Sequence, residues 1–202
     1  MRNFNLQRQE GMKQIYTIGY SAFPKPEEMI DVIQYYSITC LVDVRSSPYS
    51  SYYVEFNKEP LAARLKKAGI LYRNYAREFG ARQEDPRYLT PDGYLDFGRF
   101  TQSKAFLDGV GKLTGGIDLG YAFVLMCAEK DPMECHRGIM IGKALKDLGF
   151  EVKHILEGNR LETQEEMELR AVGNQISMFD GDDAIGRFYR EQAEKIAYKV
   201  QR

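Results

Sequence analysis

The sequence has few cysteines and histidines, no long apolar run and no excess of charge of one sign. Its 202 residues include three cysteines and two histidines. An odd number of cysteines argues against a disulfide framework, and no spacing of four cysteines predicts a structural zinc site. No apolar run approaches the roughly 18 residues that a membrane span needs. The formal net charge of −1 gives no overall bias toward nucleic acid.

The N-terminal segment lacks the apolar stretch of a secretion signal. Residues 1–12 are polar, so we expect a disordered lead-in, with Met12 as an alternative start. Together with the cysteine usage, this composition predicts a cytoplasmic protein without a membrane segment.

Short apolar runs alternate with helical patterns, which predicts a single α/β domain over residues 13–172. A hydrophobic content of 44% suffices for one sizeable core. The order of the patterns indicates a mostly parallel central sheet of about five strands with helices on both faces, a three-layer arrangement. The predicted strands are residues 14–20, 39–44, 70–74, 121–126 and 152–156, and the predicted helices begin at Pro26, Lys58, Phe100 and Gly138.

Two segments depart from this alternation. Residues 75–98 form a long connection, and structureless stretches of that length in compact domains are usually functional or disordered. Residues 173–202 are predicted to be a linker followed by an amphipathic C-terminal helix from Ala184 to Val200.

Three polar clusters follow the predicted strands. Parallel α/β sheets bind ligands outside the carboxyl ends of their strands, so these clusters are expected to meet in one site. They are Gly19-Tyr20-Ser21, residues 43–48 with Asp43, Arg45 and Ser46, and residues 127–137 with Cys127, Glu129, Cys135, His136 and Arg137.

Cys135 lies at a predicted helix N-terminus beside His136 and Arg137. The helix dipole and the basic neighbours favour the thiolate, which makes Cys135 a candidate catalytic nucleophile. Packing beneath the start of the helix explains the same cysteine equally well.

A divalent metal is a further hypothesis for this cluster, although the sequence requires no cofactor. Cys127, Cys135 and His136 are the candidate ligands, and a fourth would come from Glu129 or Asp43. Catalytic zinc needs only three protein ligands, so the set is sufficient.

Asp43 and Arg45 lie two residues apart on a strand and therefore share a face. They form either a structural ion pair or a functional one, in which Arg45 holds an anion and Asp43 or Glu129 takes part in acid–base chemistry. Arg137 at the helix start would add a second fork for phosphate or carboxylate. Further ligand-binding candidates at these strand ends are Tyr20, Ser21 and Ser46.

Residues 58–88 are locally basic, with eight lysines and arginines against four acidic residues. Aromatic residues are interleaved with them, namely Tyr72, Tyr75, Phe79 and Tyr88. Basic and aromatic side chains together suit a nucleotide or a single nucleic-acid strand. A solvated helix face followed by a packed loop would have the same composition.

The segment from Gln175 to Phe179 (QISMF) resembles the peptide by which bacterial replication and repair proteins dock on the sliding clamp. Gln175 would be the anchor, and Met178 and Phe179 the two apolar plugs. The alternative is a strap that packs Met178 and Phe179 onto the chain's own domain.

Several motifs resemble the domain of unknown function 488 family, over about residues 13–172. They are IYTIGYS at 15–21, VDVRSSPYS at 42–50, GILYRNY at 69–75, YLDFGRF at 94–100 and LMCAEKDPMECHRGIMI at 125–141. The resemblance implies an α/β fold with a strand-end site, but no established reaction. VDVRS is also similar to a piece of rhodanese and related phosphatase domains, yet the stretch from Cys127 to Arg137 is too long for their cysteine loop.

Two functions follow as hypotheses. The first is an enzyme that acts on a nucleotide or nucleic acid at the strand-end site. The second is a non-catalytic nucleotide- or nucleic-acid-binding accessory protein, tethered to DNA repair or replication through its tail. A role in small-molecule sulfur or redox chemistry is a third interpretation.

Overall fold

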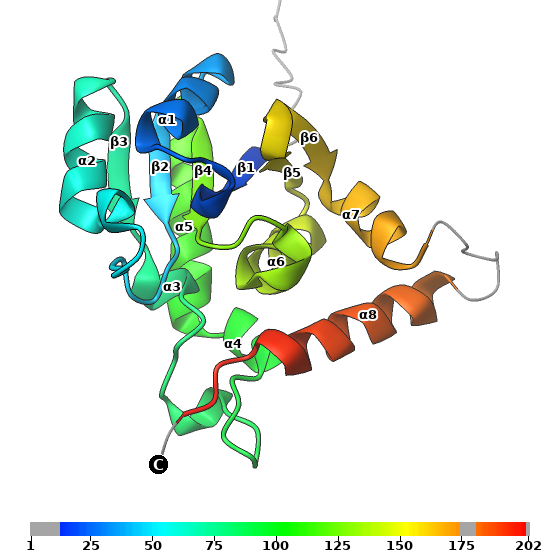
Figure 1. Ribbon diagram of the computed structural model, residues 1–202. Coiled ribbons are helices and arrows are strands. Elements are labelled where there is room, and N and C mark those ends of the chain that lie inside the picture. Colours follow the sequence, from blue (N-terminus) through cyan, green and yellow to red (C-terminus); the bar gives the residue numbers. More distant parts are fainter. Residues whose placement is uncertain (1–12, 174–180, 201–202) are drawn as a thin grey trace, which may run out of the picture.

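The computed structural model describes residues 13–173 and 181–200 (Figure 1). The lead-in predicted at residues 1–12 therefore lies outside the described residues. Within the described part of the chain, no helix combines the length and the apolar character that crossing a membrane requires.

Six strands form one sheet in the order β3-β2-β4-β1-β5-β6. The first five of these are parallel to their neighbours, and only β6 runs antiparallel, against β5. The strands are β1 (Gln14–Gly19), β2 (Cys40–Asp43), β3 (Leu71–Asn74), β4 (Phe123–Cys127), β5 (Glu151–Leu156) and β6 (Arg160–Thr163). The predicted mostly parallel sheet is confirmed. The additional strand β6 is short and polar, so it lacks the apolar run by which the others were recognised.

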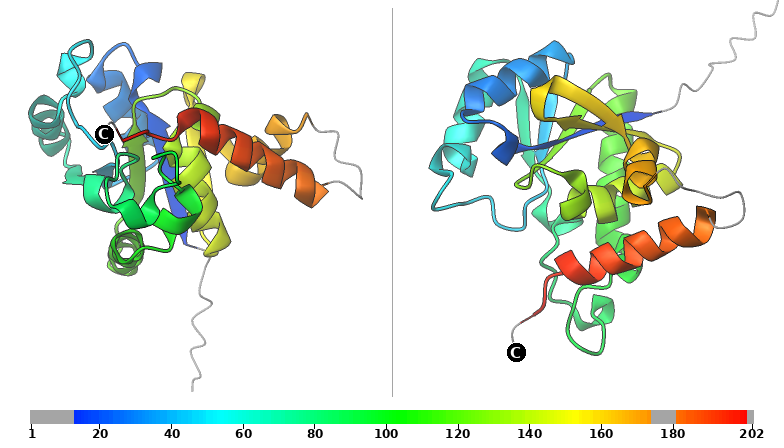
Figure 2. Two further views of the ribbon diagram at one scale, coloured as in Figure 1. Left: turned by 90° about the horizontal axis from the view of Figure 1, so that it is seen from below. Right: turned by 45° about the vertical axis from the view of Figure 1, so that its right-hand side comes forward.

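Helices cover both faces of the sheet, as the sequence predicts (Figures 1 and 2). Strands β2 and β4 are buried along their whole length, which is expected for strands covered on both sides. One face packs against α1 (Pro26–Tyr35) and α2 (Lys58–Lys67). The core of the other face includes residues of α3 (Ala76–Phe79), α4 (Phe97–Thr101), α5 (Lys104–Asp118), α6 (Lys143–Asp147), α7 (Gln164–Ala171) and α8 (Gly181–Ile196).

The helix predicted to begin at Phe100 is two helices in the structure. Helix α4 ends at Thr101, and α5 begins at Lys104. Ser103 separates them because its hydroxyl accepts a hydrogen bond from the backbone N–H of Phe106 at 3.1 Å, which makes it the N-cap of a new helix.

The two segments outside the alternation also differ from their predictions. The connection at residues 75–98 contains α3, a 3₁₀ turn over Pro86–Tyr88 and a bridge between Leu89 and Leu95. The C-terminal helix α8 is present but ends at Ile196. Beyond it, Lys199 pairs with Tyr94 in an isolated β-bridge.

Strands β1 and β4 mark the point where the chain changes direction across the sheet. The connection from β1 leads to β2, on the β3 side of β4, whereas the connection from β4 leads to β5 on the other side of β1. Such a topological switch point is where open α/β sheets bind their ligands. At the end of β1, a Cβ on Gly19 would lie 1.8 Å from the carbonyl oxygen of Glu129. Only glycine lets the loop after β4 cross so closely.

The chain continues from that loop into a π-helix, η5 (Arg137–Gly142), which leads directly into α6. All six of its residues are buried. A Cβ on Gly142 would lie 2.2 Å from the side-chain oxygen of Gln164, so the wide turn is packed tightly against α7. Single π-helical turns are rare and frequently lie at functional sites.

A buried polar network fastens α7 and α8 to the sheet. His154 of β5 accepts from the Thr17 hydroxyl at Nδ1 (2.7 Å) and donates from Nε2 to the Gln164 side-chain oxygen (2.8 Å). The Gln164 amide donates to the Tyr189 hydroxyl at 2.7 Å, which in turn donates to Glu168 at 2.7 Å. The amide nitrogen of Gln164 already donates elsewhere, so it is the amide oxygen that faces His154. An oxygen can only accept, and the proton of the neutral imidazole therefore lies on Nε2.

Because His154 is buried in this network, we predict that the stability of the protein depends on pH. Burial and the nearby charge of Arg137 lower the pKa of His154 to about 3, whereas an unfolded chain has a histidine pKa of about 6.5. Below that value the unfolded state binds the extra proton, so the free energy of unfolding falls as the pH falls. Between pH 7 and pH 5.5 this group alone should cost roughly 1 kcal/mol.

Urea denaturation of the wild type and of His154→Gln at these two pH values checks the expectation. The variant has no titrating group at this position, so its stability should fall less over the same interval. Equal losses in the two proteins would contradict the assignment.

Candidate functional site

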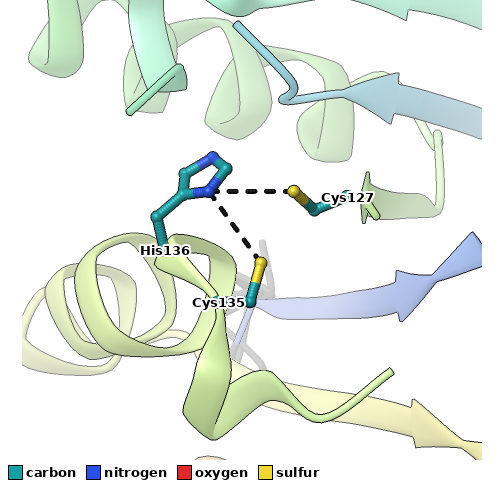
Figure 3. A group of neighbouring side chains, drawn as sticks. All are labelled: Cys127, Cys135 and His136. Atoms are coloured by element: carbon teal, nitrogen blue, oxygen red, sulfur yellow. Dashed lines mark hydrogen bonds between the residues drawn. The ribbon is translucent and has the colours of Figure 1, made fainter. Parts of the chain in front are cut away.

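Cys127, Cys135 and His136 come together at the switch point. Cys127 is the last residue of β4, and Cys135 and His136 directly precede η5. Figure 3 shows the three side chains pointing toward one another. Their exposed fractions are 3%, 1% and 8%. The loop after β4 thus folds back and closes both thiols and the imidazole into one buried cluster.

The imidazole of His136 presents its Nδ1 atom to both sulfurs. Nδ1 lies 3.7 Å from Cys127 Sγ and 3.9 Å from Cys135 Sγ. The other ring nitrogen, Nε2, lies 3.1 Å from the carbonyl oxygen of Val44. A carbonyl can only accept, so Nε2 carries a proton and donates it. In the neutral ring, the lone pair of Nδ1 then faces the two sulfurs.

The two cysteines differ in acidity. Burial opposes ionisation of Cys135, but the Cys127 thiol, the charge of Arg137 and the contact with His136 outweigh it and hold the pKa of Cys135 well below its usual range. The hydrogen bond to Cys135, together with burial, raises the pKa of Cys127 well above its usual range. Negative charge on the pair is therefore more stable on Cys135 than on Cys127.

His136 responds to the same negative charge. Burial would lower the pKa of the His136 imidazole, but the hydrogen bond and the charge of Cys135 outweigh burial and raise it. The negative charge of the cluster therefore favours the protonated, positively charged form of the imidazole.

Glu129 connects the cluster to the surface. The residue is exposed, while its Oε2 atom accepts a hydrogen bond from Cys127 Sγ at 3.2 Å. Desolvation of the carboxyl group and the nearby negative charge of Cys135 raise the pKa of Glu129. This acidic group is thus placed to exchange a proton or to contact a ligand at the mouth of the cluster.

Arg137 has a different position from the one the sequence suggested. Its side chain is fully buried, and its two terminal nitrogens donate to the carbonyl oxygens of Glu129 (2.6 Å) and Lys130 (2.8 Å). The fork expected to hold a phosphate is therefore occupied by the loop after β4. Arg137 positions that loop and supplies positive charge to Cys135.

Asp43 and Arg45 form the buried ion pair that the sequence left as an alternative. The guanidinium donates to Asp43 from Nη2 at 2.5 Å and from Nε at 2.9 Å, and Nη2 also donates to the carbonyl oxygen of Phe56 at 3.0 Å. Asp43 accepts a further bond from the Tyr72 hydroxyl at 2.7 Å. The Tyr20 ring lies under Arg45, 5.0 Å from its guanidinium carbon. Most of the donors of Arg45 are thus committed to the protein.

Two buried donors at the site nevertheless remain unpaired. Among the buried side-chain nitrogen and oxygen atoms of the described residues, only Arg45 Nη1 and Arg137 Nε lack a hydrogen-bond partner. A buried donor without a hydrogen-bond partner is unusual in a folded protein. The remaining capacity for an anion is therefore one donor from each arginine.

The serine candidates lie at the site but are engaged locally. Ser21 donates its backbone N–H to the carbonyl oxygen of Ala128, which fixes the end of β1 to the loop after β4. The Ser46 hydroxyl accepts from the backbone N–H of Arg82 at 2.8 Å. Both positions join neighbouring loops, and no pattern in the sequence indicates these partners.

The exposed aromatic residues are not those singled out in the basic segment. Phe79 is fully buried, and Tyr72 is bonded to Asp43. The loop at residues 46–57 instead exposes Tyr52 and Tyr53, by 92% and 44%. The Tyr53 ring packs edge-on against Tyr20, with 5.4 Å between the ring centroids. Their spacing shows no periodicity, so only their place after β2 could have indicated them.

The clamp-like residues Gln175, Met178 and Phe179 are outside the described part of the chain. A groove of about 790 Å³ lies between α8, α4 and η5 and includes Lys143 and Tyr189 among its lining residues. Neither Cys127 nor Cys135 lines this groove.

We predict that the effects of replacing Asp43 and Arg45 on the free energy of unfolding are strongly non-additive. Removing one partner from a buried pair leaves an uncompensated charge, so Asp43→Asn and Arg45→Met should each lower the free energy of unfolding by about 3 kcal/mol. The double variant should lose clearly less than the sum of the two, since residues in contact couple by about 0.5–3 kcal/mol.

The chain offers a matched control with the same spacing. Asp85 and Arg87 pair at 2.6 Å, but their side chains are 36% and 77% exposed. Asp85→Asn should therefore cost less than about 1 kcal/mol. Urea denaturation measures all four variants, and additive losses at Asp43 and Arg45 would contradict the buried-pair assignment.

Comparison with known families agrees with the motifs. A family model described as a domain of unknown function, DUF488, matches residues 25–143. The match spans more than half of the chain and includes both cysteines of the cluster, His136 and the Asp43–Arg45 pair. Comparison with curated proteins and comparison with solved structures each gave no match. The chain belongs to the DUF488 family.

Proposed function

We propose that this protein is an enzyme that acts on a nucleotide or a single nucleic-acid strand at the Cys127–Cys135–His136 cluster. The observation that carries the proposal is the exposed aromatic loop at residues 46–57, which packs on Tyr20, the residue after the end of β1 that pairs with Cys127. The site therefore combines reactive groups with a surface on which a base can stack.

The aromatic loop is fixed to the site by ring contacts. Tyr20 stacks on Phe56 at a centroid distance of 4.9 Å and meets Tyr53 edge-on. Tyr52, in the same loop, is 92% exposed and available to a ligand. Stacking on an aromatic side chain tolerates any base, because every base has a π-face.

Basic side chains border the same end of the sheet. Lys58 and Arg82 are exposed, and both adjoin the aromatic loop, since their backbone N–H groups donate to the Pro48 carbonyl and to Ser46. Their charges suit phosphate oxygens next to a stacked base.

The roles within the cluster follow from the contacts of each group. Cys135 is the reactive group, as a nucleophile or as a ligand of an ion, because its partners stabilise the charged sulfur. Glu129 is the acid–base group, because it reaches solvent and touches Cys127. Asp43 keeps Arg45 in place and acts through it.

A non-catalytic binding protein is the second candidate, favoured by the same aromatic and basic residues. Such a protein would use the loop at residues 46–57 to hold a strand, and the cysteines would only pack. Turnover distinguishes the two functions, because binding is expected in both.

The proposal predicts binding of a labelled single-stranded oligonucleotide, measured by fluorescence anisotropy at low salt. Tyr52→Ala should weaken binding about tenfold, since stacking is worth about 1–3 kcal/mol per base and about 1.4 kcal/mol corresponds to a factor of ten. Tyr35→Ala is the matched control. Tyr35 is 71% exposed in the last turn of α1, at the end of the helix that leads to the start of β2, and its loss should leave binding unchanged.

Mass spectrometry of oligonucleotides and nucleotides incubated with the protein then tests for reaction. Product should form with the wild type and disappear with Cys135→Ser, while binding of the oligonucleotide persists. Salt-dependent binding without product would support the accessory function instead. No binding to any nucleotide or strand would overturn both.

A further inference from the structure

We infer that Cys127, Cys135 and His136 form a three-ligand site for a zinc-type divalent ion, with a fourth position open toward Glu129. Only one part of the inference rests on the proposed function, namely that the ion lies where the reaction takes place. The binding of the ion follows from the geometry of the three side chains alone.

The imidazole nitrogen already lies at about the distance from both sulfurs that a shared metal ion would impose. Zn–S bonds of about 2.3 Å and Zn–N bonds of about 2.0–2.1 Å place tetrahedral sulfur and nitrogen ligands roughly 3.6 Å apart. Nδ1 of His136 lies 3.7 and 3.9 Å from the two sulfurs, and all three atoms lie within 4.8 Å of one another. The two nitrogen–sulfur distances are therefore within a few tenths of an ångström of those that an ion would impose.

The imidazole is oriented by a contact that metal-binding histidines commonly make. Its Nε2–H donates to the Val44 carbonyl oxygen at 3.1 Å. A hydrogen bond of this kind fixes the tautomer and the direction of the ring, and it directs the other nitrogen to the metal. The Val44 carbonyl belongs to the segment directly after β2, so the sheet itself holds the ligand in place.

The charges around the cluster suit a divalent ion. Two thiolates would neutralise the ion itself, and the fully buried Arg137 and the Glu129 carboxylate would balance each other across the same loop. The assembly would carry no net charge. The ligands are soft sulfur and imidazole nitrogen, which favour zinc and related transition metals over magnesium or calcium.

The open fourth position is what separates this site from a structural zinc site. Structural sites have four protein ligands, whereas catalytic sites have three and bind water or substrate in the fourth position. Glu129 reaches the cluster from the exposed side, with Oε2 at 3.2 Å from Cys127 Sγ. Water or substrate would therefore enter beside this carboxylate, next to the Tyr20 ring.

The experiment uses the full chain, stripped of metal under reducing conditions and titrated with zinc in competition with a chromogenic chelator. One equivalent of zinc should bind. Titration with cobalt should give the visible bands of a tetrahedral ion and the ultraviolet charge-transfer bands of two thiolates. These spectra are recorded on the wild type, so they do not depend on how a variant folds.

Variants then assign the ligands. Cys127→Ser, Cys135→Ser and His136→Gln should each weaken zinc binding by about 100-fold or more, because even groups outside the ligand shell alter metal affinity by about 10–100-fold. Cys40→Ser is the matched control. Cys40 is also a buried free cysteine, but it begins β2, at the opposite end of the strand from Val44, and its replacement should leave zinc affinity unchanged.

Four results would overturn the inference. Three are zinc binding at less than one equivalent, cobalt spectra without thiolate bands, and equal affinity in the wild type and the Cys135→Ser variant. The fourth is a Cys127–Cys135 disulfide that forms readily in air and excludes the ion. None of these measurements involves a nucleotide, so a metal site without nucleotide binding would refute the proposed function alone.

Discussion

The buried guanidinium of Arg137 is the interaction on which the site depends. Its two terminal nitrogens hold the carbonyl oxygens of Glu129 and Lys130, which fixes the loop after β4 across the end of β1. That crossing leaves no room for a side chain at Gly19. The same positive charge favours a thiolate at Cys135. One side chain thus sets the path of the loop and the ionisation of the sulfur that the loop carries.

The π-helical turn after His136 connects this arrangement to α7 and α8. The turn packs against Gln164 with almost no clearance at Gly142, and the Gln164 amide donates to the carbonyl oxygen of Gly138 at 3.0 Å. Gln164 also belongs to the network of His154 and Tyr189. The start of η5 is therefore coupled through hydrogen bonds to α7 and α8. A displacement of α8 would disturb the turn that follows the cysteine and histidine.

The sequence predicted the sheet and the meeting of its three polar clusters, because both follow from local patterns. Apolar runs identify β1 to β5, and their alternation with helices requires parallel pairing. Strand β6 was missed because three of its four residues are polar, and Leu161 alone forms no apolar run. The burial of Arg45 could not be predicted from the sequence either. A D-x-R pattern occurs at Asp43–Arg45 and at Asp85–Arg87, yet the first pair is buried and the second is exposed. Only the packing around each pair separates them.

The burial of Cys135 bears on how the site can act. At 1% exposed, its sulfur offers little room for the approach of a substrate atom, as a nucleophile would require. A ligand of an ion needs no such approach, because only the open position of the ion must reach the substrate. Glu129, Tyr20 and the loop at residues 46–57 border the cluster, with Glu129 and much of the loop exposed to solvent. The geometry therefore favours a centre in which the cysteines hold an ion and the exposed residues meet the substrate.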